Sequence, residues 1–241
     1  MKTFNIIGFG RMGIQISSLL ITMGYQVNIF SNHFNLNEKK FKISNKIFEK
    51  YLKVKQSGSY KVYQNIEDLP QNHTIETLKE DLNIKKNIIS KINYNIKDFL
   101  LFTNTSSYDP REINEHAHGL HFFNPIHQLK IIETTCSQNT INNDAKFLFD
   151  DLKKFNFKIF EVKNNRGYIY NFIYFKKIAL CYELIEKYGY EPKEIINILN
   201  SFQTNNNFEE VIKLVGKDTT KKILKNLLEN QNDIIKNPKR I

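Results

Sequence analysis

The first thirty residues constrain this chain more than any other part of it. Phe4 to Ile7 is a short apolar run that predicts a buried strand, and the turn Gly8–Gly13, which reads GFGRMG, follows at once. From Arg11 to Met23 the apolar residues recur with the period of a helix, which Gly24 ends. Val27 to Phe30 predicts a second strand. This order is the start of a parallel βαβ unit.

The glycine-rich turn fits the pattern G-x-G-x-x-G, in which each glycine has a physical task. Gly8 would allow the tight turn, Gly10 would let the backbone approach a pyrophosphate, and Gly13 would let helix and strand pack closely. The first turn of the helix would add its N–H groups and the positive end of its dipole. The sequence therefore predicts an α/β fold with a Rossmann-type doubly wound sheet that binds a dinucleotide at this turn.

The residue after the second strand bears on which dinucleotide is bound. An acid at that position holds the ribose hydroxyls of NAD in this motif, but here the position is Ser31. We assign Ser31 to the cofactor site, where it would leave room for a 2′-phosphate with Lys39 or Lys40 nearby. This position by itself leaves both NAD and NADP open as the cofactor. A weakened cofactor site is the other interpretation.

Strands and helices alternate as far as residue 165, and helices alone are predicted after it. The polar run Gln203–Asn207 predicts a loop within that helical part. We therefore predict a dinucleotide-binding Rossmann domain over residues 1–165 and a small all-helical domain over residues 166–241. Further strands are predicted at Thr74–Thr77, Phe99–Thr103, Leu120–Phe123, Lys130–Thr134 and Phe157–Val162, and helices at Glu38–Lys55, Leu82–Ile92, Asp144–Phe155 and Tyr168–Tyr188.

Composition excludes several classes of protein. The 241 residues carry 35 Lys+Arg against 25 Asp+Glu, but no compact stripe of cations with interleaved aromatic residues predicts a nucleic-acid partner. Cys136 and Cys181 are the two cysteines, too few for a disulfide framework, and they have no metal-type spacing. A reducing, cytoplasmic compartment is expected. No apolar run approaches the roughly 18 residues of a membrane span, and the N-terminus lacks the features of a signal peptide.

The most distinctive sequence segment is GLHFFNP at residues 119–125, followed by LKIIE at residues 129–133. His121 lies on one predicted strand and Glu133 lies on the next. A carboxylate beside a histidine fixes the imidazole tautomer and raises its basicity, as general acid–base chemistry near neutral pH requires. The pair is therefore a candidate catalytic dyad, with a structural histidine as the alternative interpretation.

These residues, with others in the same order, resemble the L-3-hydroxyacyl-CoA dehydrogenases, two-domain NAD-dependent enzymes of β-oxidation and butyryl-CoA metabolism. The resemblance covers nearly the whole chain, and a weaker likeness extends over Phe208–Thr220. The segments that carry it are Gly8–Gly13, Ile75–Leu82, Thr103–Ser107, His121–Glu133 and Gly167–Asn171.

The resemblance implies a role for each matched residue. His121 would take the proton from the 3-hydroxyl group as hydride leaves C3 for the nicotinamide, and Glu133 would orient His121. Ser106 and Asn171 would hydrogen-bond the reacting oxygen, and Asn124 would help to position His121 and the acyl group.

Two further matched residues concern the cofactor. Asn104 and Glu76 would lie along its nicotinamide half. The resemblance also implies an acyl-CoA or related thioester as the substrate, a homodimer as the assembly, and a substrate and dimerisation role for the helical domain, residues 166–241. Neither nucleic acid nor membrane is expected as a partner, because the composition offers no signal for either.

The chain departs from the family in ways that keep alternatives open. The stretch from Asn32 to Asn65 is shorter than the family's helical hairpin, which contacts coenzyme A, and the helical domain is expected to be shortened at its C-terminal end. The substrate could instead be a non-CoA hydroxy acid or a thioester on a carrier protein. A non-catalytic dinucleotide or acyl-CoA sensor is the alternative from another class, and a nucleic-acid binder is the third.

Overall fold

A computed structural model describes residues 2–92, 99–137 and 143–201, together with residues 216, 219, 222, 223, 225 and 226. The chain divides into two compact units, Met1–Asn165 and Arg166–Ile241. The loop predicted at Gln203–Asn207 and most of the family-like segment Phe208–Thr220 lie outside the described residues.

The first unit is built on one sheet of eight strands in the order β3-β2-β1-β4-β5-β6-β7-β8. The pairs from β3 through to β6 are parallel, β6 and β7 are antiparallel, and β7 and β8 are parallel. The strands are β1 (Thr3–Ile7), β2 (Gln26–Phe30), β3 (Ser59–Tyr63), β4 (His73–Glu76), β5 (Leu101–Thr103), β6 (Ala117–Phe122), β7 (Ile131–Thr134) and β8 (Lys158–Glu161). This confirms the predicted doubly wound α/β fold.

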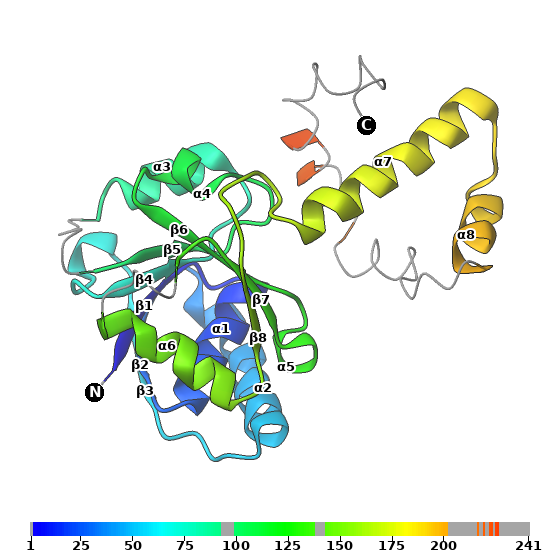
Figure 1. Ribbon diagram of the computed structural model, residues 1–241. Helices are drawn as coiled ribbons and strands as arrows, with labels where there is room; N and C mark the ends of the chain where they lie inside the picture. Colours follow the sequence, from blue (N-terminus) through cyan, green and yellow to red (C-terminus); the bar gives the residue numbers. More distant parts are fainter. Residues whose placement is uncertain are drawn as a thin grey trace. The chain divides into compact units, whose positions relative to one another are not determined.

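Helices cover both faces of the sheet, with α1, α2 and α6 on one face and α3 and α4 on the other (Figure 1). Each helix forms where apolar residues recur at helical spacing, so one side can be buried against the strands. The elements of this unit are α1 (Arg11–Thr22), α2 (Phe34–Leu52), η1 (Ile66–Asp68), α3 (Leu82–Ile89), α4 (Pro110–Ile113), α5 (Ile126–Leu129) and α6 (Asn143–Lys154).

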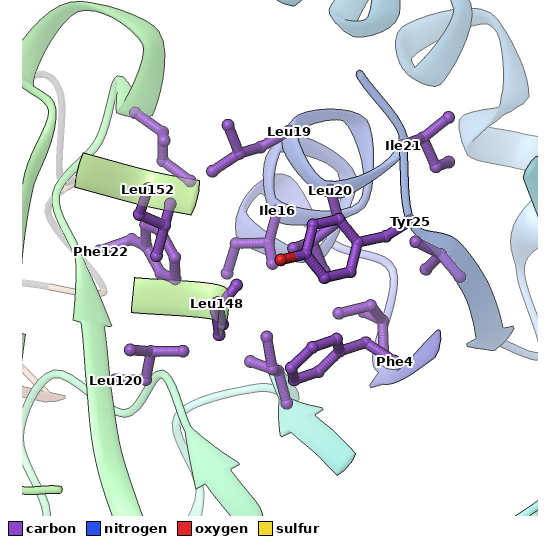
Figure 2. Packing of buried hydrophobic residues seen from close by; sticks show 14 of the residues in the cluster. Phe4, Ile16, Leu19, Leu20, Ile21, Tyr25, Leu120, Phe122, Leu148 and Leu152 are labelled. Carbon is purple, nitrogen blue, oxygen red and sulfur yellow. The ribbon is translucent and has the colours of Figure 1, made fainter. Parts of the chain in front are cut away.

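The larger core lies on the α1 face of the sheet (Figure 2). Ile16 and Leu20 of α1 pack there against Phe4 of β1 and Leu148 of α6, and all four side chains are fully buried. Burial of one such side chain stabilises the fold by about 1.5–3 kcal/mol. This packing holds α1, and with it the glycine-rich turn, in a fixed place at the end of β1.

One strand, one strand direction and the short helices α4 and α5 were not predicted from the sequence. The edge strand β3 was not predicted, because Ser59 and Lys61 interrupt its apolar residues and the apolar signal is weak. All five residues of the strand are exposed or half-exposed. The direction of β7 was not predicted either, because apolar patterning does not report strand direction. The remaining predicted strands and helices are present, and their ends differ from the predicted ones by at most four residues.

The second unit contains two long helical segments among its described residues, α7 (Tyr170–Tyr188) and α8 (Pro192–Ser201). Gly189 ends α7 in the left-handed conformation, with φ of 70°, as a C-terminal glycine usually does. Tyr174 and Phe175 are buried on α7, whereas Tyr182 is 45% exposed. Across the described part of the chain, no helix is both long and apolar enough to cross a membrane.

Candidate active site and cofactor crevice

The crevice at which a dinucleotide would bind is set by the strand order. β1 lies between β2 and β4, so the chain reverses its winding at β1 and β4, and such a switch point is where open α/β sheets bind ligands. Gly8 follows β1 at this point, with φ of 96°. A Cβ at Gly8 would come within 2.8 Å of the Thr77 carbonyl oxygen, and one at Gly13 within 2.2 Å of the Gly8 oxygen. Protein packing therefore requires both glycines.

Gly10 differs from its two neighbours in the motif. Among the described residues, no atom lies within 4 Å of where a Cβ on Gly10 would be. Packing therefore gives no reason for this glycine, whereas close approach of a pyrophosphate does. Helix α1 begins directly after Gly10, which offers no side-chain cap, so the first-turn N–H groups suit a phosphate. These residues fit a dinucleotide.

Ser31 lies directly after β2, as the sequence predicts. Its backbone N–H donates to the Tyr63 carbonyl, and its Oγ accepts from the His33 backbone N–H at 3.2 Å. No acid occurs from residue 31 to residue 37, and the next one, Glu38, pairs with Lys42. The segment that follows β2 therefore carries no acidic side chain up to residue 37. The role of Ser31 at the ribose stays a prediction.

The candidate dyad is brought together by the antiparallel pairing of β6 with β7. The register places His121 opposite Glu133, and the His121 Nδ1 lies 3.1 Å from the Glu133 Oε2. Both residues are buried, at 4% and 5% exposure. The ring of Phe123 lies 4.5 Å from the imidazole, centroid to centroid. In this low-dielectric setting the carboxylate holds the ring with Nδ1 toward it, so Nε2 is the nitrogen on the side away from Glu133.

The segment after His121 is held by α1. The Asn124 Oδ1 accepts from the Gln15 Nε2 at 2.8 Å, and the Gln15 Oε1 accepts from the Ile126 backbone N–H at 3.0 Å. One glutamine side chain therefore ties both sides of the cis Asn124–Pro125 bond to the helix that follows the glycine-rich turn. Gln15 was not predicted from the sequence. Its one signal there is a polar side chain near the start of a helix that is largely buried.

Asn104 and Ser106 lie on the loop after β5. The Asn104 Oδ1 accepts from the Phe122 backbone N–H at 2.9 Å, which ties this loop to the end of β6. The Ser106 backbone N–H donates to the Glu80 Oε1 at 2.9 Å, and its hydroxyl donates to the same oxygen at 3.4 Å. The loop is thus anchored next to the strand that carries His121. The roles of Asn104 and Ser106 toward cofactor and substrate stay predictions.

Glu76 is the last residue of β4, and its side chain is wholly buried. The Lys85 ammonium lies 2.8 Å and 3.0 Å from its two carboxylate oxygens, and the Thr103 hydroxyl donates to it at 2.6 Å. The Leu78 backbone N–H also donates to this carboxylate. The structure therefore shows Glu76 in a buried ion pair, and its predicted contact with the cofactor stays a prediction.

Lys85 joins Glu76 to a second carboxylate, Glu80. The Lys85 Nζ lies 3.3 Å from the Glu80 Oε2, while the Glu80 Oε1 accepts from the hydroxyls of Thr105 and Ser107, each at 2.7 Å. The Ser107 backbone N–H donates to the same oxygen at 3.0 Å. This set of Glu76, Glu80 and Lys85, which we call the acidic cluster, holds the loop that carries Ser106.

Charge balance sets the protonation of the acidic cluster. Burial opposes ionisation of Glu80, but the Lys85 ammonium and the hydrogen bonds from the 105–107 loop outweigh it, so the pKa of Glu80 lies below its ordinary value. Burial likewise favours neutral Lys85, but the two carboxylates outweigh it and the pKa of Lys85 lies above its ordinary value. Both groups are therefore charged across the neutral range.

The sequence also contains a signal for the burial of Lys85. Leu82, Lys85 and Ile89 recur at intervals of three and four residues, so Lys85 occupies an apolar-face position of α3. A lysine at such a position is buried only when it is paired. Glu80 could then have been recognised as one partner, because it closely precedes the helix.

Asn171 lies in the first turn of α7, in the second unit, and is 9% exposed. Because the two units are described separately, its predicted contact with the reacting oxygen stays a prediction.

The doubly wound sheet, with a G-x-G-x-x-G turn at its switch point, defines a dinucleotide-binding protein of the Rossmann type. The model of the 3-hydroxyacyl-CoA dehydrogenase NAD binding domain matches residues 3–164. The chain therefore belongs to the 3-hydroxyacyl-CoA dehydrogenase family, a family of oxidoreductases.

Individual relatives agree with this assignment. A 3-hydroxybutyryl-CoA dehydrogenase of Clostridioides difficile is 27% identical over 185 residues, which are 69% of this chain and 65% of that protein. A fatty acid oxidation complex subunit alpha of Vibrio parahaemolyticus is 27% identical over 190 residues, but only 27% of its length is matched. The chain thus spans slightly under two thirds of the first relative and about a quarter of the second.

A solved structure supports the fold over the whole chain. The structure of FadB2 of M. tuberculosis superposes with a TM-score of 0.79 at 19% identity, and the match covers 99% of this chain and 89% of that one.

Proposed function

We propose that this chain is an oxidoreductase that transfers hydride between a nicotinamide cofactor and C3 of a 3-hydroxyacyl thioester. In the names of its relatives the thioester is carried by coenzyme A. The observation that carries the proposal is the His121–Glu133 pair, buried at 3.1 Å on paired strands of a unit that belongs to this family. When bound, the cofactor would supply the hydride acceptor or donor.

His121 would supply the proton chemistry. In the oxidative direction its Nε2 would accept the proton of the 3-hydroxyl group while C3 loses hydride, which leaves a keto group and a protonated imidazole beside Glu133. In the reductive direction the same nitrogen would return the proton to the oxygen. Proton transfer by a positioned side chain contributes roughly 10²–10⁴-fold in rate. Glu133 would stabilise the imidazolium and fix its orientation.

Other residues would bind and orient the substrate. Ser106 and Asn171 would donate to the oxygen on C3, and Asn124, held by Gln15, would position His121 and the acyl group. Gly8, Gly10 and Gly13 would hold the pyrophosphate, with Ser31 at the ribose and with Glu76 and Asn104 toward the nicotinamide. NAD is the proposed cofactor, and the neutral Ser31 also supports use of NADP. A homodimer in the cytoplasm remains a prediction from the sequence.

The test is the absorbance of reduced nicotinamide when the protein is mixed with acetoacetyl-CoA and, in separate reactions, NADH and NADPH. Oxidation of either cofactor is the expected result, and their ratio reports the preference at Ser31. If folded protein binds a dinucleotide but oxidises neither cofactor with any 3-ketoacyl thioester, the sensor interpretation replaces this proposal.

A further inference from the structure

Helix α2 carries an exposed apolar row along one of its sides. Leu36, Ile43, Ile47 and Tyr51 recur at intervals of seven, four and four residues, which places them on one helical face. Leu36 is 77% exposed, Ile43 52% and Tyr51 45%. The opposite side of the helix, with Phe41 and Phe48, is the side buried in the core. The row spans about 22 Å at 1.5 Å per residue.

A row of lysines runs beside the apolar row. Lys39, Lys46 and Lys50 each follow one of the apolar residues by three positions, so they form a parallel line on the same exposed side. All three are exposed, and among the described residues none of them forms an ion pair. The two acids of the helix are engaged elsewhere, Glu38 with Lys42 and Glu49 with the Gln56 backbone N–H. The surface is therefore apolar and positively charged together.

This surface adjoins a pocket whose lining includes Pro125, in the segment that follows His121. Ile43 and Ile47 line a pocket of about 230 Å³ whose other walls include Ile14, Gln15 and Pro125. Gln15 is the residue that holds the amide of Asn124, three positions after His121. A flexible acyl arm could therefore enter beside α2 and reach the segment that carries the dyad.

We propose that this face of α2 docks an acidic, helical carrier domain that presents the acyl group as a phosphopantetheine thioester. The inference rests on the proposed function and specifies its substrate. Coenzyme A gathers its charge in one nucleotide, whereas the lysine row extends along the apolar row for several helical turns. An acidic amphipathic helix matches both rows at once: its apolar side covers Ile43 and its carboxylates meet the lysines. The pocket then receives the arm.

The first measurement is binding, which does not depend on catalysis. A fluorescently labelled bacterial type II acyl carrier protein, carrying phosphopantetheine without an acyl group, is titrated with the full chain at low and at moderate salt. We expect binding that weakens as salt rises. The double variant Lys46→Glu/Lys50→Glu should weaken it at least tenfold, and the matched control Lys86→Glu/Lys91→Glu, with the same charge change on and just after α3, should stay within twofold.

A second pair of variants tests the apolar row without a change of charge. Ile43→Ser should weaken binding of the carrier several-fold, while Ile198→Ser, at a similarly exposed isoleucine of α8, should not. If both isoleucine variants, or both lysine variants, behave alike, the docking surface is wrong.

Turnover separates this inference from the proposed function. With reduced cofactor, the acetoacetyl group on the carrier should give a kcat/KM at least tenfold above that of acetoacetyl-pantetheine, and Lys46→Glu/Lys50→Glu should remove only that advantage. Equal kcat/KM for both thioesters overturns the docking surface and leaves the proposed function standing. No turnover of any thioester overturns the proposed function, and the docking surface then stands or falls on the binding titration. Binding to anionic vesicles or self-association through Ile43, in place of carrier binding, overturns the inference.

Discussion

Glu76 and Glu133 occupy similar places, each buried on a strand of the same sheet, but they face different partners. Glu76 meets a lysine and two hydrogen-bond donors, in a cluster that also contains Glu80. Glu133 meets an imidazole at 3.1 Å. A lysine whose pKa lies above its ordinary value keeps its proton near neutral pH, whereas an imidazole is the side chain that exchanges protons there.

The difference teaches that a buried carboxylate takes its role from the group opposite it. In the acidic cluster the charges compensate one another and pin the loop that carries Ser106. In the dyad the carboxylate supports a group that can gain and lose a proton. The first arrangement should therefore respond to mutation mainly in stability, and the second mainly in rate.

The largest effect is expected from His121→Gln. The glutamine amide can still donate to Glu133, but it cannot exchange a proton with a substrate, so kcat should fall by roughly 10²–10⁴-fold. The free energy of unfolding should change by no more than about 1 kcal/mol, since the hydrogen bond is retained. Steady-state kinetics with acetoacetyl-CoA and urea denaturation measure the two quantities. Activity within a few-fold of the parent would remove His121 as the acid–base group.

Lys85→Met should show the opposite pattern. It leaves Glu76 and Glu80 buried without a cation, and loss of one partner of a buried ion pair costs about 3–5 kcal/mol of unfolding free energy. Urea denaturation followed by circular dichroism gives this value. Lys86→Met, at an exposed neighbour, is the control and should change stability by less than about 0.5 kcal/mol.

A triple variant keeps the prediction testable if the Lys85→Met protein does not fold. Glu76→Gln/Glu80→Gln/Lys85→Met removes all three charges together, and we expect it to be more stable than Lys85→Met alone. Equal stability of the two proteins would show that the charges of the cluster are not coupled.

Acid should weaken the cluster through Glu80. Because the pKa of Glu80 in the folded protein lies below its ordinary value of 4.5, its contribution to stability is complete above that pH. It is lost as the pH falls from about 4.5 through the folded value, at no more than about 1.4 kcal/mol per pH unit for one proton. Urea denaturation from pH 7 to pH 3 should show this slope for the parent and a shallower one for Glu80→Gln. Identical slopes would contradict the assigned charge state.

The smallest effect concerns the cofactor rather than either carboxylate site. Ser31→Asp places a negative charge at the end of β2, which should accept the ribose hydroxyls of NADH and repel a 2′-phosphate. The ratio of kcat/KM for NADH to that for NADPH should rise about tenfold, or about 1.4 kcal/mol. Ser31→Asn, a neutral change of similar size, is the control. An unchanged ratio for Ser31→Asp would place the ribose elsewhere.

Local patterns in the sequence predicted most of the first unit. The strand, turn and helix of residues 4–23 each carry a clear periodicity, and Gly8 and Gly13 report close contacts that a larger residue would block. The dyad was also predicted, because His121 and Glu133 belong to two neighbouring apolar runs. β3 was missed because an edge strand needs little apolar patterning. Gln15 was missed because its partners lie more than 100 residues away in the chain.

The sequence by itself determined the type and order of most elements, though not β3 or the short helices α4 and α5. It also determined the glycine-rich turn and the two residues of the candidate dyad, because these depend on contacts between near neighbours or on residue chemistry. The tertiary structure alone decided that β7 runs antiparallel to β6, which brings His121 opposite Glu133, and that Lys85 lies between Glu76 and Glu80. The physical reason is that strand direction and the pairing of buried charges are settled by packing across the sheet, where residues distant in the chain exclude water together.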